Sequence, residues 1–111
     1  MMTFRSGRTR RGVSYICSPY RGDTARNTTY ARELVKQELE LGFAPICPHL
    51  YLPQILDDSK PKEREQALRV GLELLRGCDV VIVGTRYGIS DGMRAEIERA
   101  KELGKRIHYY D

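Results

Sequence analysis

The sequence predicts a single α/β domain in which helices cover both faces of a four-stranded parallel sheet. Short β-branched and aromatic segments alternate along the chain with longer amphipathic segments, an order typical of strands joined by helical crossovers. Such crossovers are right-handed and leave the strands parallel. With 111 residues, the chain has room for one hydrophobic core.

The first half of the chain contains two predicted strands and one predicted helix. Residues 13–17 are expected to form the first strand, which Pro19 ends. Residues 27–41 place apolar side chains on one helical face and are followed by a glycine, so they are expected to form a helix. A second strand is expected over residues 43–47. Residues 50–60 then read as a loop with a short helical turn.

The second half contains two more helices and two more strands. A helix is expected over residues 61–76, because its first turns are acidic and a glycine follows its end. Residues 79–84 include four consecutive apolar residues, as in a strand buried on both faces. Residues 91–103 are expected to form the third helix and residues 106–110 the last strand.

The positive charge of the chain is concentrated at its start. Four arginines between positions 5 and 11 account for the net charge of +4, and the remaining 15 basic residues balance 15 acidic ones. Residues 1–12 are therefore expected to form a basic flexible tail, and residues 13–111 the folded domain. The tail could contact nucleic acid or a membrane surface, or it could simply be solvated. The balanced domain gives no electrostatic reason to bind nucleic acid.

The remaining composition is that of an ordinary cytoplasmic protein. No apolar run approaches the roughly 20 residues of a membrane span, and the basic start lacks the apolar core of a secretory signal. Cys17, Cys47 and Cys78 have no metal-like spacing and lie in or beside apolar segments. We therefore expect a cytoplasmic location and buried, reduced thiols.

Polar residues follow the first three predicted strands. Residues 18–23 follow the first strand, residues 48–49 the second and residues 85–92 the third. In open parallel sheets, ligands bind beyond the carboxyl ends of the strands. The predicted topology therefore brings five residues of interest to one rim of the sheet: Tyr20, Arg21, His49, Ser90 and Glu96.

Glu96 is an acidic residue on the apolar side of the third predicted helix. At about 100° per residue, it falls within an arc that consists of Met93, Ile97, Ala100 and Leu103. A carboxylate in an apolar stripe is unfavourable unless something requires it there, and the nearby helix start favours its charged form. Glu96 is therefore the first candidate for a catalytic group, although it could also be a buried acid paired to Arg21 or Arg86.

The rim residues suit chemistry at an electrophilic carbon. A carboxylate in a largely apolar cleft can attack the anomeric carbon of a sugar. Ser90 and Gly92 could present a hydroxyl and a backbone N–H to an anion, and Arg21 offers a planar fork for a phosphate or carboxylate. Tyr15 or Tyr20 could stack on a base or hydrogen-bond to a sugar.

Each of these residues also has a purely structural interpretation. Arg21 could close a turn or pair with Asp23, and Ser90 could only cap its helix. His49 could be a satisfied structural histidine, and Tyr15 could belong to the strand core.

Four segments at these spacings together resemble the nucleoside 2-deoxyribosyltransferase superfamily. Residues 92–96 (Gly-Met-Arg-Ala-Glu), with Ala100 and a Gly-Lys pair at 104–105, are similar to its nucleophile motif. Residues 15–22 (Tyr-Ile-Cys-Ser-Pro-Tyr-Arg-Gly) and the Pro-His pair at 48–49 resemble its 2′-deoxynucleoside 5′-phosphate N-hydrolase branch. Cys-Asp-Val-Val at 78–81 is similar to the Ala-Asp-Val-Val of the family. The chain also resembles small uncharacterised prokaryotic and phage proteins placed beside this superfamily.

The resemblance implies a flavodoxin-like three-layer sandwich and a Glu nucleophile. In this chain Glu96 would form a glycosyl-enzyme, and Arg21, Ser90 and Gly92 would hold a 5′-phosphate. Relatives use no metal or organic cofactor, and they are dimers or larger in which a neighbouring subunit helps to close the site. A homodimer is also expected because a four-stranded sheet in a short chain leaves faces poorly covered. Apolar residues such as Leu50, Leu52, Ile55 and Leu56 lie in a segment that could cover a partner.

Gly71 is the one serious departure from the family pattern. The hydrolase branch carries an aspartate eight residues before the Asp of strand three, and counting back from Asp79 gives Gly71. Either another group does the work of that acid, for example Asp57, Asp58, Asp91 or a residue of a neighbouring subunit, or the reaction is altered or lost. A glycine in mid-helix costs about 1 kcal/mol against alanine, which hints at close packing or at room for a ligand.

The sequence therefore predicts N-glycosidic bond cleavage or transfer on a nucleoside or nucleoside 5′-monophosphate. The alternative is a non-catalytic nucleotide-binding or sensor module of the same fold. The expected catalytic residue is Glu96. The expected substrate-binding residues are Tyr15, Ser18, Pro19, Tyr20, Arg21, Gly22, His49, Ser90, Gly92 and Met93.

Overall fold

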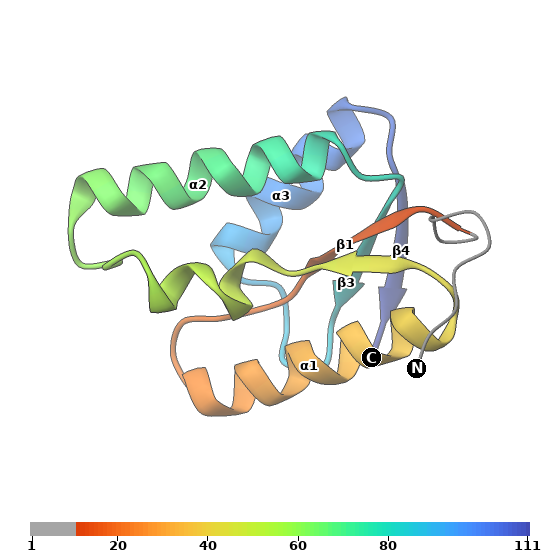
Figure 1. Ribbon diagram of the computed structural model, residues 1–111, viewed down its shortest axis with the longest axis horizontal. Coiled ribbons are helices and arrows are strands. Elements are labelled where there is room, and N and C mark those ends of the chain that lie inside the picture. The colour runs from red at the N-terminus through yellow and green to blue at the C-terminus, as the bar shows by residue number, and fades with distance from the viewer. Residues whose placement is uncertain (1–10) are drawn as a thin grey trace, which may run out of the picture.

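The computed structural model describes residues 11–111 and confirms the predicted α/β architecture. The four strands are all parallel, in the order β2-β1-β3-β4. Their bounds are β1 Val13–Cys17, β2 Ala44–Ile46, β3 Val80–Gly84 and β4 Arg106–Tyr110. The helices are α1 Thr24–Glu40, α2 Pro61–Arg76 and α3 Asp91–Glu102, with short 3-10 turns η1 Pro48–Leu50 and η2 Leu52–Gln54. Figure 1 shows α1 on one side of the sheet and α2 and α3 on the other.

Strand β3 lies at the centre of the core because both of its faces are covered. Val81 and Val83 pack with residues of α2 and α3, whereas Val80 and Ile82 pack with residues of α1. All four side chains are buried. The continuous apolar run is therefore explained as the sequence predicts, because β3 is a central parallel strand with no solvent-facing side.

Helix α1 packs unusually close to the carboxyl end of β3. A Cβ added at Gly84 would lie 2.6 Å from both Leu34 Cδ1 and Tyr30 Oη. Since real Cβ atoms do not approach so closely, any larger residue at this position would force the buried side chains of Tyr30 and Leu34 to shift. The close approach places the loop after β3, from which α3 begins, next to the start of α1.

Helix α1 begins three residues before the predicted start at position 27. The Asp23 side chain caps it by accepting a hydrogen bond from Arg26 N at 3.1 Å. Asn27 is instead fully buried, and its Nδ2 donates to the carbonyl oxygens of Tyr20 and Arg21 at 3.0 and 3.1 Å. The buried amide thereby holds the loop after β1 against the first turn of α1.

The other predicted bounds are confirmed to within a residue or so. Residues 61–76 and the first and last strands match the prediction, and β2 is one residue shorter at each end. The three cysteines are buried and free of disulfides, as expected. The basic tail predicted over residues 1–12 lies, apart from its last two residues, outside the described part of the chain.

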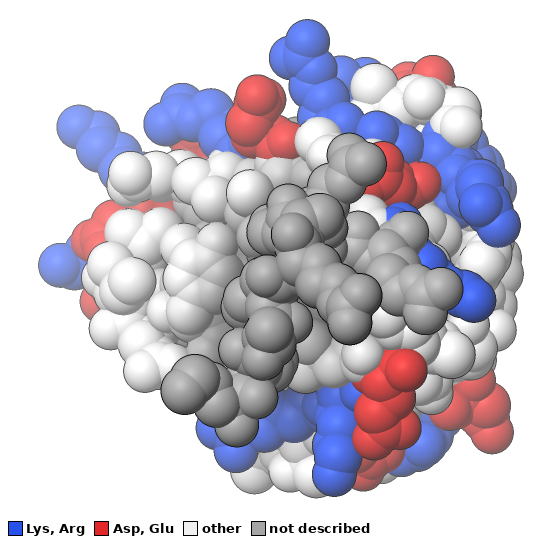
Figure 2. All heavy atoms as spheres, turned by 45° about the vertical axis from the view of Figure 1, so that its right-hand side comes forward, with Lys and Arg blue, Asp and Glu red and all other residues white. Residues whose placement is uncertain are grey.

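The surface of the described residues carries both signs of charge. On the face shown in Figure 2, the basic and acidic side chains of the described residues are interspersed around the periphery. Within residues 11–111, every helix is too short or too polar to cross a lipid bilayer.

Candidate active site

Glu96 reaches the sheet from α3, and its partner is a tyrosine of β1. The Tyr15 hydroxyl donates a hydrogen bond to Glu96 Oε2. The Tyr15 ring is only 2% exposed and belongs to the core beneath α2 and α3, whereas Glu96 is partly exposed. The carboxylate therefore lies at the border between core and solvent, near the carboxyl end of β1.

The environment of Glu96 opposes its ionisation in one respect and supports it in another. Burial raises the pKa of the Glu96 carboxyl, and the hydrogen bond from Tyr15 opposes part of that rise. Burial and the nearby carboxylate both raise the pKa of the Tyr15 hydroxyl. Tyr15 therefore keeps its proton and acts as a permanent donor to Glu96.

The backbone of α2 comes close to this pair at Gly71. A Cβ added there would lie 3.3 Å from Tyr15 Oη and 3.9 Å from Glu96 Oε2. The first distance is tighter than an ordinary contact and the second is ordinary. The missing side chain at this position therefore reflects close packing of α2 on the Tyr15–Glu96 pair.

Residues after β1 and β2 meet in a second group around His49. The Oγ of the buried Ser18 lies 3.4 Å from His49 Nε2, and the rings of Tyr20 and His49 stack with their centroids 5.5 Å apart. Burial lowers the pKa of His49 to about 4, so the ring is neutral at physiological pH. A neutral imidazole can either donate or accept a hydrogen bond, according to its tautomer.

Arg21 has neither of the partners that the sequence suggested. Its Nη2 lies 2.8 Å from both carboxylate oxygens of Asp58. The Asp23 side chain instead caps α1. Arg86, the other arginine suggested as a partner of Glu96, pairs with Glu33 at 2.9 Å. Asp58 lies in the segment between η2 and α2, and the sequence did not suggest it as a partner of Arg21.

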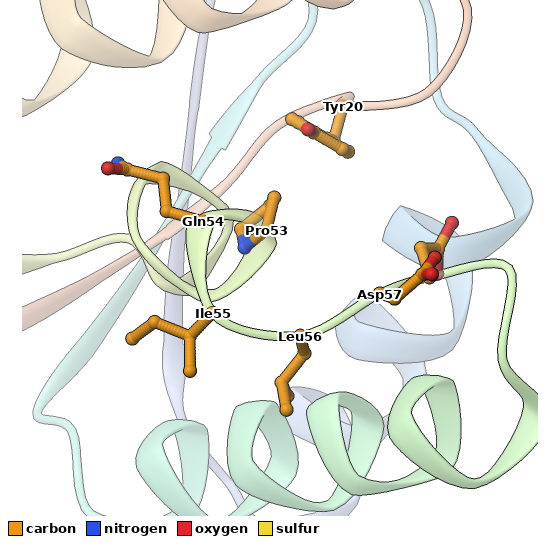
Figure 3. Close-up of a pocket in the computed structure, with 7 residues that line it drawn as sticks. Tyr20, Pro53, Gln54, Ile55, Leu56 and Asp57 are labelled. Carbon is orange, nitrogen blue, oxygen red and sulfur yellow. The ribbon is translucent and has the colours of Figure 1, made fainter.

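A pocket of about 380 Å³ opens next to this ion pair. Its lining combines one aromatic ring with residues from η2 to the start of α2: Tyr20, Pro53, Gln54, Ile55, Leu56, Asp57 and Asp58. Figure 3 shows Tyr20 facing the loop that carries Pro53, Leu56 and Asp57. The size is within the usual range of small-molecule sites. Glu96 is not among the residues that line it.

The start of α3 combines a cap with an exposed backbone. Ser90 Oγ accepts a hydrogen bond from Met93 N at 3.2 Å, so the serine caps the helix. Ser90 and Gly92 are exposed, whereas the Met93 side chain is 2% exposed and packs in the core. Met93 O accepts a hydrogen bond from Cys17 Sγ at 3.7 Å.

The predicted site residues therefore fall into three groups along one rim. Tyr15 contacts Glu96, and Ser18 and Tyr20 contact His49. Ser90 and Gly92 lie at the start of α3. Of the other predicted residues, Pro19 is buried, and Gly22 is exposed with a φ of +95° that favours glycine.

Sequence reasoning missed two residues that organise this rim, Asp58 and Asn27. The sequence suggests Asp58 only as a possible replacement for the missing aspartate, and its contact with Arg21 spans 37 residues. For Asn27 the sequence predicts only the start of a helix. A polar residue on the inner face of that helix was the available signal for its buried role.

Comparisons with known proteins agree with this architecture. The family described as Domain of unknown function (DUF7768) matches residues 13–110. The curated proteins include no match.

Three solved structures share the fold at low sequence identity. A 2-deoxyribosyltransferase from Bacillus psychrosaccharolyticus has a TM-score of 0.65 and 19% identity, over 87% of this chain and 70% of that chain. A 2-deoxyribosyltransferase from Leishmania mexicana has a TM-score of 0.61 and 17% identity, over 89% and 63%. The CMP N-glycosidase BcmB from Clostridium botulinum has a TM-score of 0.54 and 16% identity, over 87% and 66%. The chain thus has a nucleoside 2-deoxyribosyltransferase-like fold and spans less than two thirds of the length of the last two relatives.

Proposed function

The chain belongs to the family described as Domain of unknown function (DUF7768), and we propose that it cleaves or transfers the N-glycosidic bond of a nucleoside or nucleoside 5′-monophosphate. The observation that carries the proposal is the Glu96 carboxylate, which lies partly buried at the rim with the Tyr15 hydroxyl bonded to it. Proteins of the same fold include 2-deoxyribosyltransferases and a CMP N-glycosidase, which supports glycosyl chemistry in general.

In the proposed reaction, Glu96 is the nucleophile. One carboxylate oxygen forms a bond to C1′ of the sugar while the C1′–N bond breaks. The electron pair of the C1′–N bond leaves with the base. The base takes a proton from a nearby acid or from water. Water then attacks C1′, which releases the sugar and restores the carboxylate; attack by a second base instead would complete a transfer.

The surroundings of Glu96 suit this role. Partial burial removes water that would otherwise solvate the carboxylate, and the Tyr15 hydroxyl fixes Oε2 in one orientation. The other oxygen, Oε1, is then the one available to react. Because Tyr15 stabilises the ionised form of Glu96, loss of the hydroxyl should reduce the fraction of active enzyme at neutral pH.

The remaining predicted residues supply binding groups in this proposal. The stacked Tyr20 and His49 rings offer a surface for a base, and Ser18 lies beside them. Ser90 and the backbone N–H groups at the start of α3 offer donors to polar groups of the sugar or phosphate.

Base release from a panel of nucleosides and their 5′-monophosphates tests the proposal. Chromatography of the reaction products should detect free base with the wild-type protein, and Glu96→Gln should abolish it. Glu98→Gln is the matched control, because Glu98 is exposed on the same helix and pairs with Lys101 at 3.6 Å. Failure to release base from every compound at high enzyme concentration, or activity that survives Glu96→Gln, would reject the proposal.

The presence of a second base in the same assay distinguishes transfer from hydrolysis. A transferase would produce a new nucleoside when a second, different base is present, whereas a hydrolase would release free sugar or sugar phosphate in either case.

Gly71 favours a second candidate function, a non-catalytic nucleotide-binding module. No side chain from α2 can assist Glu96 at this position, and a Cβ would already approach Tyr15 Oη to 3.3 Å. A binding module would be stabilised against heat by a nucleotide without turning it over. In that case Glu96→Gln should leave the shift in melting temperature largely intact.

We also propose that the protein forms a homodimer. Ile55 is 71% exposed, and on α2 Leu68 and Leu72 are 61% and 39% exposed, so apolar side chains are available to cover a partner. Light scattering at micromolar concentration should give twice the mass of 12.8 kDa. A monomer mass would reject the dimer without affecting the proposed chemistry.

A further inference from the structure

Arg21, the residue that would hold a 5′-phosphate, is already neutralised by a neighbour. Its Nη2 lies 2.8 Å from Asp58 Oδ1 and 2.8 Å from Asp58 Oδ2. Both side chains are about half exposed, at 53% and 50%, so the pair is in reach of a ligand. A phosphate that bound Arg21 would have to displace Asp58 or lie next to its carboxylate.

A second carboxylate lies beside the same pocket. Asp57 Oδ1 accepts hydrogen bonds from Ser59 N at 2.9 Å and from Ser59 Oγ at 2.6 Å. These hydrogen bonds lower the pKa of the Asp57 carboxyl, so it is ionised at neutral pH. Lys60 interacts with this carboxylate and also with Glu63, 3.6 Å away, so one lysine is shared by two acids.

The start of α3 does not restore a positive site. Asp91 is its first residue, and the exposed Arg94 follows three residues later, so their charges offset each other. A phosphate dianion beside Arg21 would therefore meet a cation that Asp58 already neutralises, unlike the phosphate sites that are built from arginine clusters.

We propose that Asp58 is a specificity-determining residue which makes the site select an uncharged nucleoside over its 5′-monophosphate. This inference rests on the proposed function. A neutral ligand leaves the Arg21–Asp58 pair intact, and it can donate hydroxyl or exocyclic amino hydrogens to the carboxylates and the Gln54 amide that line the pocket. Tyr20 supplies the aromatic surface.

The expected preference for the nucleoside over its monophosphate follows from the repulsion between the Asp58 carboxylate and the phosphate. A carboxylate about 6 Å from a phosphate dianion in a water-like dielectric weakens binding about tenfold. Because the pair is exposed, salt should screen this effect.

Calorimetric titration with nucleosides and their 5′-monophosphates tests the inference directly. At low salt, wild-type protein should bind a nucleoside more tightly than its monophosphate, and Asp58→Asn should shift the ratio of the two dissociation constants about tenfold towards the monophosphate. Raising the salt should reduce the shift. Glu65→Gln is the matched control: it removes the same charge from an exposed pair with Arg69, 3.2 Å apart on α2, and should leave the ratio unchanged.

Three results would overturn the inference: a wild-type preference for the monophosphate, an equal shift in Asp58→Asn and Glu65→Gln, or binding of neither compound. The assay separates this inference from the proposed function. The predicted binding ratio without any base release would reject the glycosidic reaction alone. Faster base release from the monophosphate than from the nucleoside would reject the role of Asp58 alone.

Discussion

Gly71→Ala is the substitution that tests the geometry of the site most directly. Alanine is favoured over glycine in a helix interior by about 1 kcal/mol, so a free site on α2 would gain stability. Here the new Cβ would lie 3.3 Å from Tyr15 Oη, with Glu96 Oε2 at an ordinary 3.9 Å. The outcome therefore depends on whether the Tyr15 hydroxyl can move.

The structure indicates that Tyr15 cannot move without loss. Its ring is 2% exposed within the core, and its hydroxyl donates to the Glu96 carboxylate. Breaking a hydrogen bond to a charged group costs about 2 kcal/mol. Set against the helix-propensity gain, Gly71→Ala should destabilise the protein by about 1 kcal/mol.

Tyr15→Phe removes the oxygen atom that causes the conflict. In that background the Cβ of alanine would have only the 3.9 Å contact with Glu96, so Gly71→Ala should stabilise the protein by about 1 kcal/mol. The four proteins form a double-mutant cycle with an expected coupling of about 2 kcal/mol between positions 15 and 71.

Urea denaturation of the wild type, the two single variants and the double variant measures this coupling. Equal effects of Gly71→Ala in both backgrounds would refute the reasoning, because they would mean that α2 does not press on the Tyr15 hydroxyl. A stabilising Gly71→Ala in the wild type would likewise show that the hydroxyl can move at no cost.

Three further predictions concern the stability contributed by residues around the site. Ser90→Ala should destabilise the protein by about 1 kcal/mol in urea denaturation and Ser90→Gly by only a few tenths, because the serine Oγ caps α3. Gly84→Ala should cost about 3 kcal/mol, seen as a much lower melting temperature, since its Cβ would lie 2.6 Å from Tyr30 Oη and Leu34 Cδ1, and both buried side chains would have to shift. Burial lowers the pKa of His49 to about 4 from 6.5, so this group should leave the free energy of unfolding unchanged above pH 6.5 and lower it by about 3 kcal/mol as the pH falls to 4. Urea denaturation across that range should show the decline in the wild type relative to His49→Gln, and parallel profiles would contradict it.

The periodicity of the sequence was sufficient to predict the fold and the inward position of Glu96. A four-residue apolar run identifies β3 as buried on both faces, and the helical arc of α3 places Met93 and Ile97 in the core with Glu96 beside them. These features depend on neighbours within one element, where spacing alone determines which side chains share a face.

The partners of the site residues could not be predicted because they come from distant elements. Tyr15 and Glu96 are 81 residues apart, and Arg21 and Asp58 are 37 apart. The second pair depends on the path of the segment after η2, which has no periodicity to follow. For Arg21 the nearest acid in sequence, Asp23, was an obvious partner, but the helix start required its side chain as a cap.

The same geometry explains why introducing an aspartate at position 71, as the resemblance to the N-hydrolase branch would suggest, would not simply add an acid to the site. A side chain at that position must pass Tyr15 Oη at 3.3 Å before it reaches the carboxylate of Glu96. An aspartate there would also add a second negative charge beside Glu96, which would raise the pKa of a carboxyl that burial has already raised. Tyr15 and Gly71 are therefore best understood as a matched pair: the hydroxyl from β1 contacts Glu96 because α2 offers no side chain in its place.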